Sequence, residues 1–127
     1  MEKKQSCCSG NARLVMACAG GSNVGQITNE AAKLLDTEGC ARYFCLAGVG
    51  GHVSGMVASV KGADRVLVID GCPVACGKAA MESEGLGNYE YLVVTDLGIE
   101  KTHDFALNAA DIALVLEESR ARLNSRS

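Results

Sequence analysis

The sequence predicts an α/β fold, a three-layer sandwich built on a mostly parallel, four-stranded sheet. Short apolar runs alternate along the chain with segments of helical periodicity, and this alternation is typical of βαβ units. The apolar runs are nearly continuous, as expected of parallel strands buried on both faces. The chain has 127 residues, 48% of them hydrophobic, which is enough for one domain with its own core.

Four hydrophobic segments are expected to form the strands. They cover residues 14–17, 41–44, 66–69 and 89–94. Because crossovers between parallel strands are right-handed, the helices between them should cover both faces of the sheet. We predict a flavodoxin-like strand order of 2-1-3-4.

Four helices are expected between and after these strands. They cover residues 24–36, 53–61, 73–84 and 104–123, and an interruption of the last one near residues 108–111 is left open. Pro73 suits the first position of the third helix, where a missing N–H group has no cost. The first helix has a face of apolar residues, expected to be buried, made of Ile27, Ala31, Leu34 and Leu35.

The rest of the chain indicates one domain without linkers. Residues 1–12 are expected to be a flexible lead, residues 13–123 a single metal-binding domain, and residues 124–127 a tail. The net charge of −3 does not indicate the positively charged surface that binds nucleic acid. No run approaches the ~20 apolar residues of a membrane span, and the first residues lack the apolar stretch of a signal peptide. We therefore expect a cytoplasmic protein with no membrane or nucleic-acid partner.

The cysteines give the strongest functional signal. Seven thiols in a reducing compartment more often serve metal binding or catalysis than a disulfide framework. Cys18 follows the first strand, Cys45 ends the second, Cys72 follows the third, and Cys76 lies one helical turn later. Ligands bind outside the carboxyl ends of strands in open parallel sheets. The spacing therefore predicts that these four thiols share one edge of the sheet.

The segment from Cys72 to Cys76 is suited to chelation. With Pro73 as the first helical residue, Cys72 would be the N-cap, and both thiols would lie near the positive end of the helix. Side chains four residues apart lie on the same face of a helix. Tetrahedral Zn²⁺ is commonly bound by cysteine thiolates, so this pair is a candidate for half of a zinc site.

A glycine-rich loop joins the first strand to the first helix, between Cys18 and Gly25. Its amides and the helix N-terminus could hold a small anion, with Gly21, Ser22 and Asn23 as the candidate contacts. The loop matches neither a P-loop nor a dinucleotide fingerprint. A tight turn that lets the backbone pass close to the thiols is an equally good interpretation.

Several other residues at the strand ends are weaker candidates. His52 follows a second glycine-rich loop and is a candidate ligand or proton carrier. Lys78 would favour a thiolate at Cys76 if the two side chains meet. Asp70 and Asp96 are expected to accept hydrogen bonds around the site or to cap helices.

At these residues the sequence resembles the DGC domain family, a group of small zinc-binding proteins named after the tripeptide Asp70-Gly71-Cys72. The resemblance runs from about residue 14 to residue 116. It rests on Cys18 with residues 21–26, on Cys45, on residues 70–73 with Cys76, and on residues 94–98. It implies a chelating set of four cysteines, namely Cys18, Cys45, Cys72 and Cys76. Cys7 and Cys8 lie outside the pattern.

Three functions remain open from the sequence. The first is a metal-binding protein that holds zinc through four thiolates and serves metal handling, sensing or an active site. The second is an iron–sulfur protein, because four cysteines suit a cluster equally well. The third is a thiol/disulfide redox enzyme that cycles Cys72 and Cys76. Catalytic residues and a protein partner are not predicted.

Overall fold

The computed structural model describes residues 12–125, in which four parallel strands form one sheet of order β2-β1-β3-β4. The strands are β1 (Arg13–Ala17), β2 (Arg42–Tyr43), β3 (Arg65–Asp70) and β4 (Glu90–Val93). In the register, Val15 of β1 pairs with Tyr43 of β2 and with Leu67 of β3. The predicted fold class and strand order are therefore confirmed. Most of the predicted lead, residues 1–11, and the end of the predicted tail lie outside the described residues.

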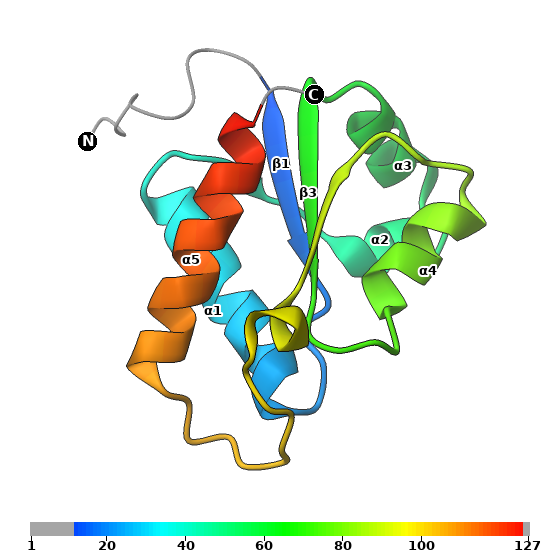
Figure 1. Ribbon diagram of the computed structural model, residues 1–127. Helices are drawn as coiled ribbons and strands as arrows, with labels where there is room; N and C mark the ends of the chain where they lie inside the picture. The colour runs from blue at the N-terminus through cyan, green and yellow to red at the C-terminus, as the bar shows by residue number, and fades with distance from the viewer. Residues whose placement is uncertain (1–11, 126–127) are drawn as a thin grey trace.

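Helices cover both faces of the sheet (Figure 1). On one face lie α1 (Asn23–Thr37) and α5 (Ala109–Asn124). On the other lie α2 (Leu46–Gly50), α3 (Ser54–Lys61) and α4 (Cys76–Ser83). The short 3₁₀ helix η1 (Val94–Leu97) follows β4 directly.

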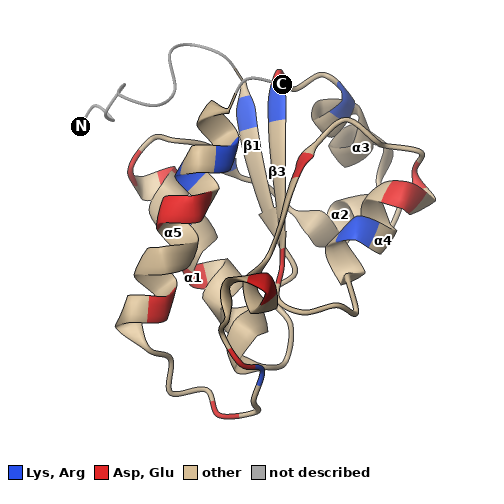
Figure 2. Cartoon of the chain, in the orientation of Figure 1, with Lys and Arg blue, Asp and Glu red and all other residues tan. Residues whose placement is uncertain are grey.

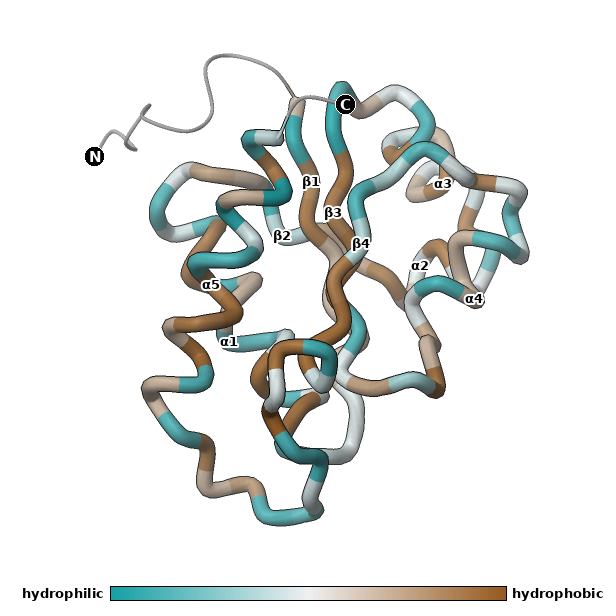
Figure 3. Tube along the Cα trace, viewed as in Figure 1, coloured by the Kyte–Doolittle hydropathy of each residue, from teal (hydrophilic) through white to brown (hydrophobic). Residues whose placement is uncertain are grey.

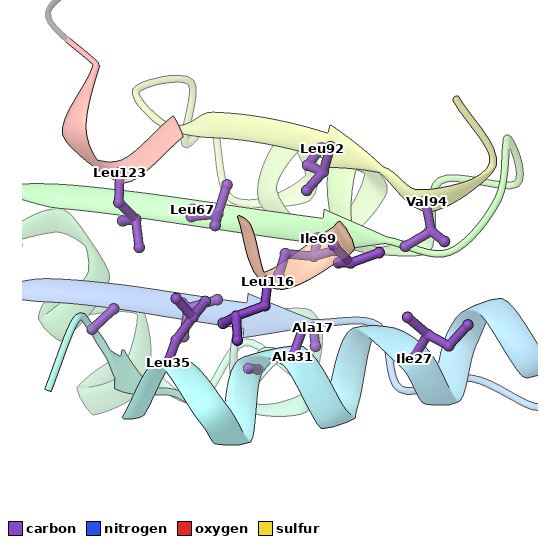
Figure 4. Close-up of a cluster of buried hydrophobic side chains, with 14 of the residues drawn as sticks. Ala17, Ile27, Ala31, Leu35, Leu67, Ile69, Leu92, Val94, Leu116 and Leu123 are labelled. Carbon is purple, nitrogen blue, oxygen red and sulfur yellow. The ribbon is translucent and has the colours of Figure 1, made fainter. Parts of the chain in front are cut away.

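The strands are apolar on both sides because each side meets a layer of helices. Val15 and Leu67 belong to the core under α1 and α5, whereas their neighbours Met16 and Val68 belong to the core under α2, α3 and α4. Hydrophobic residues run along the central strands in Figure 3, and Figure 4 shows the larger cluster, in which Leu35 and Leu116 face the sheet. Alternate side chains of a strand point to opposite faces, so a nearly continuous apolar run is required here.

Helix α1 follows its predicted pattern with one exception. Ile27, Ala31 and Leu35 are buried, but Leu34 is 38% exposed and does not belong to the buried face. The helix begins where Ser22 caps it, since the Ser22 hydroxyl accepts a hydrogen bond from the Gly25 N–H at 3.1 Å. Gly39, with φ of 78°, follows its carboxyl end.

The third predicted helix begins later than expected. We placed its start at Pro73 with Cys72 as N-cap, but α4 begins at Cys76 and its N-cap is Ala75. Ala75 is in the left-handed region, with φ of 59°, and this breaks the helical path after Pro73. The cap comes from elsewhere in the chain, because Asp70 accepts hydrogen bonds from the backbone N–H groups of Gly77 and Lys78.

The last helix begins later than predicted. The expected start near residue 104 is wrong, because Asn108 caps α5 by accepting a hydrogen bond from the Ala110 N–H at 2.8 Å. Residues 104–108 form an extended segment outside the helix. Helix α2 was not predicted, because it has only five residues, too few to show a helical periodicity, and begins only three residues after the end of β2.

The surface carries both signs of charge, spread over all layers (Figure 2). Within residues 12–125, no helix combines the length and the apolar character that crossing a bilayer requires.

Candidate functional site

Three cysteines lie at the carboxyl edge of the sheet, each after a different strand. Cys18 follows the last residue of β1 directly, Cys45 lies two residues after β2, and Cys72 lies two residues after β3. These strands are neighbours and parallel, so their ends point to the same edge. Cys76 is the first residue of α4. The structure thus brings the four predicted ligands to the edge on which the sequence placed them.

Cys18 is held by the neighbouring strand and by α1. Its backbone N–H donates to the carbonyl of Ile69 in β3 at 3.1 Å. Its Sγ lies 3.8 Å from the hydroxyl of Thr28, which itself donates to the Gly25 carbonyl at 2.6 Å. The sulfur is half-buried. A buried threonine therefore positions both the glycine-rich loop and the first thiol.

Cys18 and Cys45 line the same cavity, together with Tyr43. The Tyr43 hydroxyl donates a hydrogen bond to Asn29 at 2.8 Å. Burial raises the pKa of Tyr43, and negative charge at Cys18, Cys45 and Glu30 raises it further. Both sulfurs are thus close enough to influence one phenol, and that phenol stays protonated at neutral pH.

Cys72 has a cationic neighbour that sequence reasoning missed. The ammonium group of Lys101 donates a hydrogen bond to the Cys72 sulfur at 3.4 Å. Lys101 belongs to the segment that leaves η1 after β4, so the fourth strand also contributes to this edge. A search for charged residues after each strand end would have found it, because the same rule that located the cysteines applies to β4.

The Cys72–Cys76 pair is arranged differently from the prediction. The two residues are joined by a tight turn in which the Ala75 N–H donates to the Cys72 carbonyl at 3.1 Å. Only Cys76 lies at the N-terminus of α4, and it is exposed, whereas Cys72 is half-buried. The ammonium group of Lys78, which would favour a Cys76 thiolate if the two side chains met, lies over the Tyr91 ring, 5.8 Å from the centroid.

Within the part of the chain that the structure describes, no three His, Cys, Asp or Glu side chains are grouped so as to hold a metal ion. The strand ends bring the four cysteines to one edge of the sheet, but their side chains are not grouped around a common point. The assignment of Cys18, Cys45, Cys72 and Cys76 as metal ligands stays a prediction.

The sequence matches the family model of the DGC domain over residues 14–119. This chain belongs to the DGC domain family. One relative is the anaerobic and virulence modulator AnvM of Pseudomonas aeruginosa. It is 35% identical to this chain over 98 residues, which cover 77% of this chain and 75% of the relative. No solved structure matches this DGC domain.

The tripeptide that names the DGC domain has a separate structural role for each residue. Asp70 is buried, with 1% exposed, and its carboxylate caps α4, as its position at the strand end suggested. Gly71 lies against the start of α1, where a Cβ atom would be 2.8 Å from the backbone nitrogen of Gly25. Cys72 then carries the thiol. The first two residues thus fix the backbone from which the third presents its sulfur.

The polar groups of the glycine-rich loop of the DGC domain have partners within the protein. Ser22 caps α1, and the Asn23 side chain donates to the Glu100 carbonyl at 2.8 Å and accepts from the Thr102 N–H at 2.5 Å. These contacts tie the loop to the segment that carries Lys101. Binding of an anion by Gly21, Ser22 and Asn23 stays a prediction, and the structure gives two of these side chains a structural role.

The side chain of His52 pairs with Glu84 and not with a cysteine. It has a left-handed backbone, with φ of 60°, and its Nδ1 pairs with the carboxylate of Glu84 after α4. This contact joins the loop after α2 to the end of α4.

Proposed function

We propose that this DGC domain binds zinc through the thiolates of Cys18, Cys45, Cys72 and Cys76. The observation that carries the proposal is that three adjacent parallel strands each deliver a cysteine to the same edge. Four thiol sulfurs form a donor set that Zn²⁺ prefers. None of the four is among the buried residues, and Cys45 and Cys76 are exposed.

The proposed site is not needed to complete the core. Two hydrophobic clusters already fill both sides of the sheet, and Cys72 only touches the edge of one of them. Structural zinc sites typically stabilise domains that lack such a core. We therefore assign the metal to sensing, handling or an active site. The name of the relative AnvM, which describes a modulator, supports a sensing role.

Lys101 supports the thiolate character of the site. Four thiolates around Zn²⁺ carry a net charge of about −2, and such a charge is costly near a half-buried position. The ammonium group that donates to Cys72 partly offsets it. Binding requires the four sulfurs to converge, and the exposure of Cys45 and Cys76 leaves their side chains room to turn.

The test is the metal content of the untagged, full-length chain purified without oxygen. We expect about one zinc per chain and no visible colour, and a sharp loss of zinc in Cys72→Ser and Cys76→Ser. Ser54→Ala, at an exposed position at the start of α3, is the control and should retain zinc.

Other outcomes would contradict the proposal. Full zinc content in Cys72→Ser or Cys76→Ser would show that the ligand set is wrong. Iron with sulfide and a brown chromophore would establish an iron–sulfur protein instead. Metal-free protein in which Cys72 and Cys76 form a reversible disulfide would establish the thiol redox function.

A further inference from the structure

A cavity of about 590 Å³ opens beside the cysteines, where the carboxyl ends of β1 and β2 meet α2 and α4. This volume lies in the range of small-molecule binding sites, roughly 300–1,000 Å³. The residues that matter for its chemistry are Cys18, Tyr43, Phe44, Cys45 and Ala80. Two of the proposed zinc ligands, Cys18 and Cys45, line the cavity, whereas Cys72 and Cys76 do not.

The lining has no charged side chain. Its polar side-chain atoms are the sulfurs of Cys18 and Cys45 and the hydroxyl of Tyr43, and that hydroxyl already donates to Asn29. A charged molecule that entered would lose its hydration without gaining an ionic partner. An uncharged apolar molecule would instead bury its surface against Phe44 and the small aliphatic residues of the walls.

Small residues keep the cavity open. Gly50 of α2 and Ala80 of α4 adjoin in its wall, because a Cβ atom added at Gly50 would stand 3.6 Å from the Ala80 Cβ, an ordinary contact distance. Because Ala80 lines the cavity, we expect a larger side chain at this position to take up part of the cavity volume. This allows the cavity to be narrowed by one substitution.

We propose that this cavity binds small, uncharged, largely apolar molecules and holds them against the sulfurs of Cys18 and Cys45. The inference goes beyond zinc binding, because most of the lining is apolar and supplies no metal ligand. It also predicts that the thiols of Cys45 and Cys76 react differently with apolar reagents. Both cysteines are exposed, but Cys45 lines this uncharged, largely apolar cavity, whereas Cys76 lies at a helix N-terminus and does not line it.

The test compares two thiol reagents on the reduced, full-length chain after metal removal with a chelator. The probes are benzyl methanethiosulfonate, which is neutral and apolar, and sulfonatoethyl methanethiosulfonate, which is anionic. In both cases the thiolate attacks the sulfenyl sulfur, a mixed disulfide forms, and methanesulfinate leaves. Modification of each cysteine is followed by peptide mass spectrometry over time and over reagent concentration.

We expect the ratio of benzyl to sulfonatoethyl rates to be about tenfold higher at Cys45 than at Cys76, the effect of burying roughly two methylene groups. The benzyl rate at Cys45 should also saturate with concentration, because binding precedes reaction. Ala80→Leu should lower the ratio at Cys45 to that at Cys76 and abolish saturation. Ala79→Leu, on an exposed position of the same helix, should leave both unchanged.

Equal ratios at Cys45 and Cys76, or a benzyl rate that rises linearly in the unmodified protein, would overturn the proposal. So would an equal effect of Ala79→Leu and Ala80→Leu. If Ala80→Leu does not fold, Ala47→Leu in the lining from α2 serves the same purpose. Zinc content, measured on the same preparation before chelation, separates the two proposals, because either result can occur without the other.

Discussion

The buried carboxylate of Asp70 accepts a hydrogen bond from the hydroxyl of Tyr91 at 2.6 Å, which joins the end of β3 to β4. The same carboxylate accepts from the backbone N–H groups of Gly77 at 2.7 Å and Lys78 at 3.0 Å. One side chain therefore holds together the third strand, the fourth strand and the start of α4. The turn that carries Cys72 and Cys76 lies between the residues so connected.

Asp70→Asn should destabilise the protein by about 2–4 kcal/mol. The amide replaces one accepting oxygen by a donor, so a backbone N–H group or the Tyr91 hydroxyl loses its partner. The free energy of unfolding in urea is the measurement. Asp96→Asn, at an exposed position after the next strand, is the control and should change stability by less than about 0.5 kcal/mol. Equal stability of the two variants would show that the Asp70 contacts do not contribute.

Stability should fall as the pH rises above about 10, in part because of Tyr91. Burial raises the pKa of Tyr91, and the hydrogen bond and negative charge of Asp70 raise it further, from an ordinary value of 10.0. The folded state therefore keeps this proton after the unfolded state has lost it. The contribution is complete below pH 10 and is lost as the pH rises toward the folded-state pKa, by at most about 1.4 kcal/mol per pH unit.

Tyr91→Phe should be less stable at neutral pH and should lose part of this alkaline dependence. Urea unfolding between pH 8 and 11 measures both effects. Tyr89→Phe is the matched control, because Tyr89 packs edge-on against Tyr91, with ring centroids 6.1 Å apart, and burial raises its pKa as well. An unchanged alkaline dependence in Tyr91→Phe would refute the role of the Asp70–Tyr91 contact.

Gly71→Ala should destabilise the protein by about 1–3 kcal/mol, the usual effect of overpacking. A Cβ atom at Gly71 would lie 2.8 Å from backbone atoms of Val24 and Gly25, which cannot move without displacing the start of α1. Gly21→Ala is the control, because nothing lies within 4 Å of the added Cβ. Urea midpoints of the two variants provide the measurement. If the Gly21 variant were as unstable as the Gly71 variant, close approach at Gly71 would not be the cause.

The sequence alone was sufficient for the framework. The apolar runs at β1 and β3 identified strands, because burial on both faces requires a continuous hydrophobic segment. The edge position of Cys18, Cys45 and Cys72 followed from the rule that parallel strands end together. The interruption left open near residues 108–111 coincides with the true start of α5 at Ala109, which Asn108 caps.

The tertiary structure decided how the site is built. The start of α4 depends on Asp70, the cation beside Cys72 comes from Lys101, and the cavity forms between α2 and α4. Each involves residues that are well separated along the chain and meet only after folding. Local periodicity reports which face of an element is buried, but not which distant side chain meets it. The sequence by itself thus determined where the cysteines lie, and the packed structure determined what surrounds them.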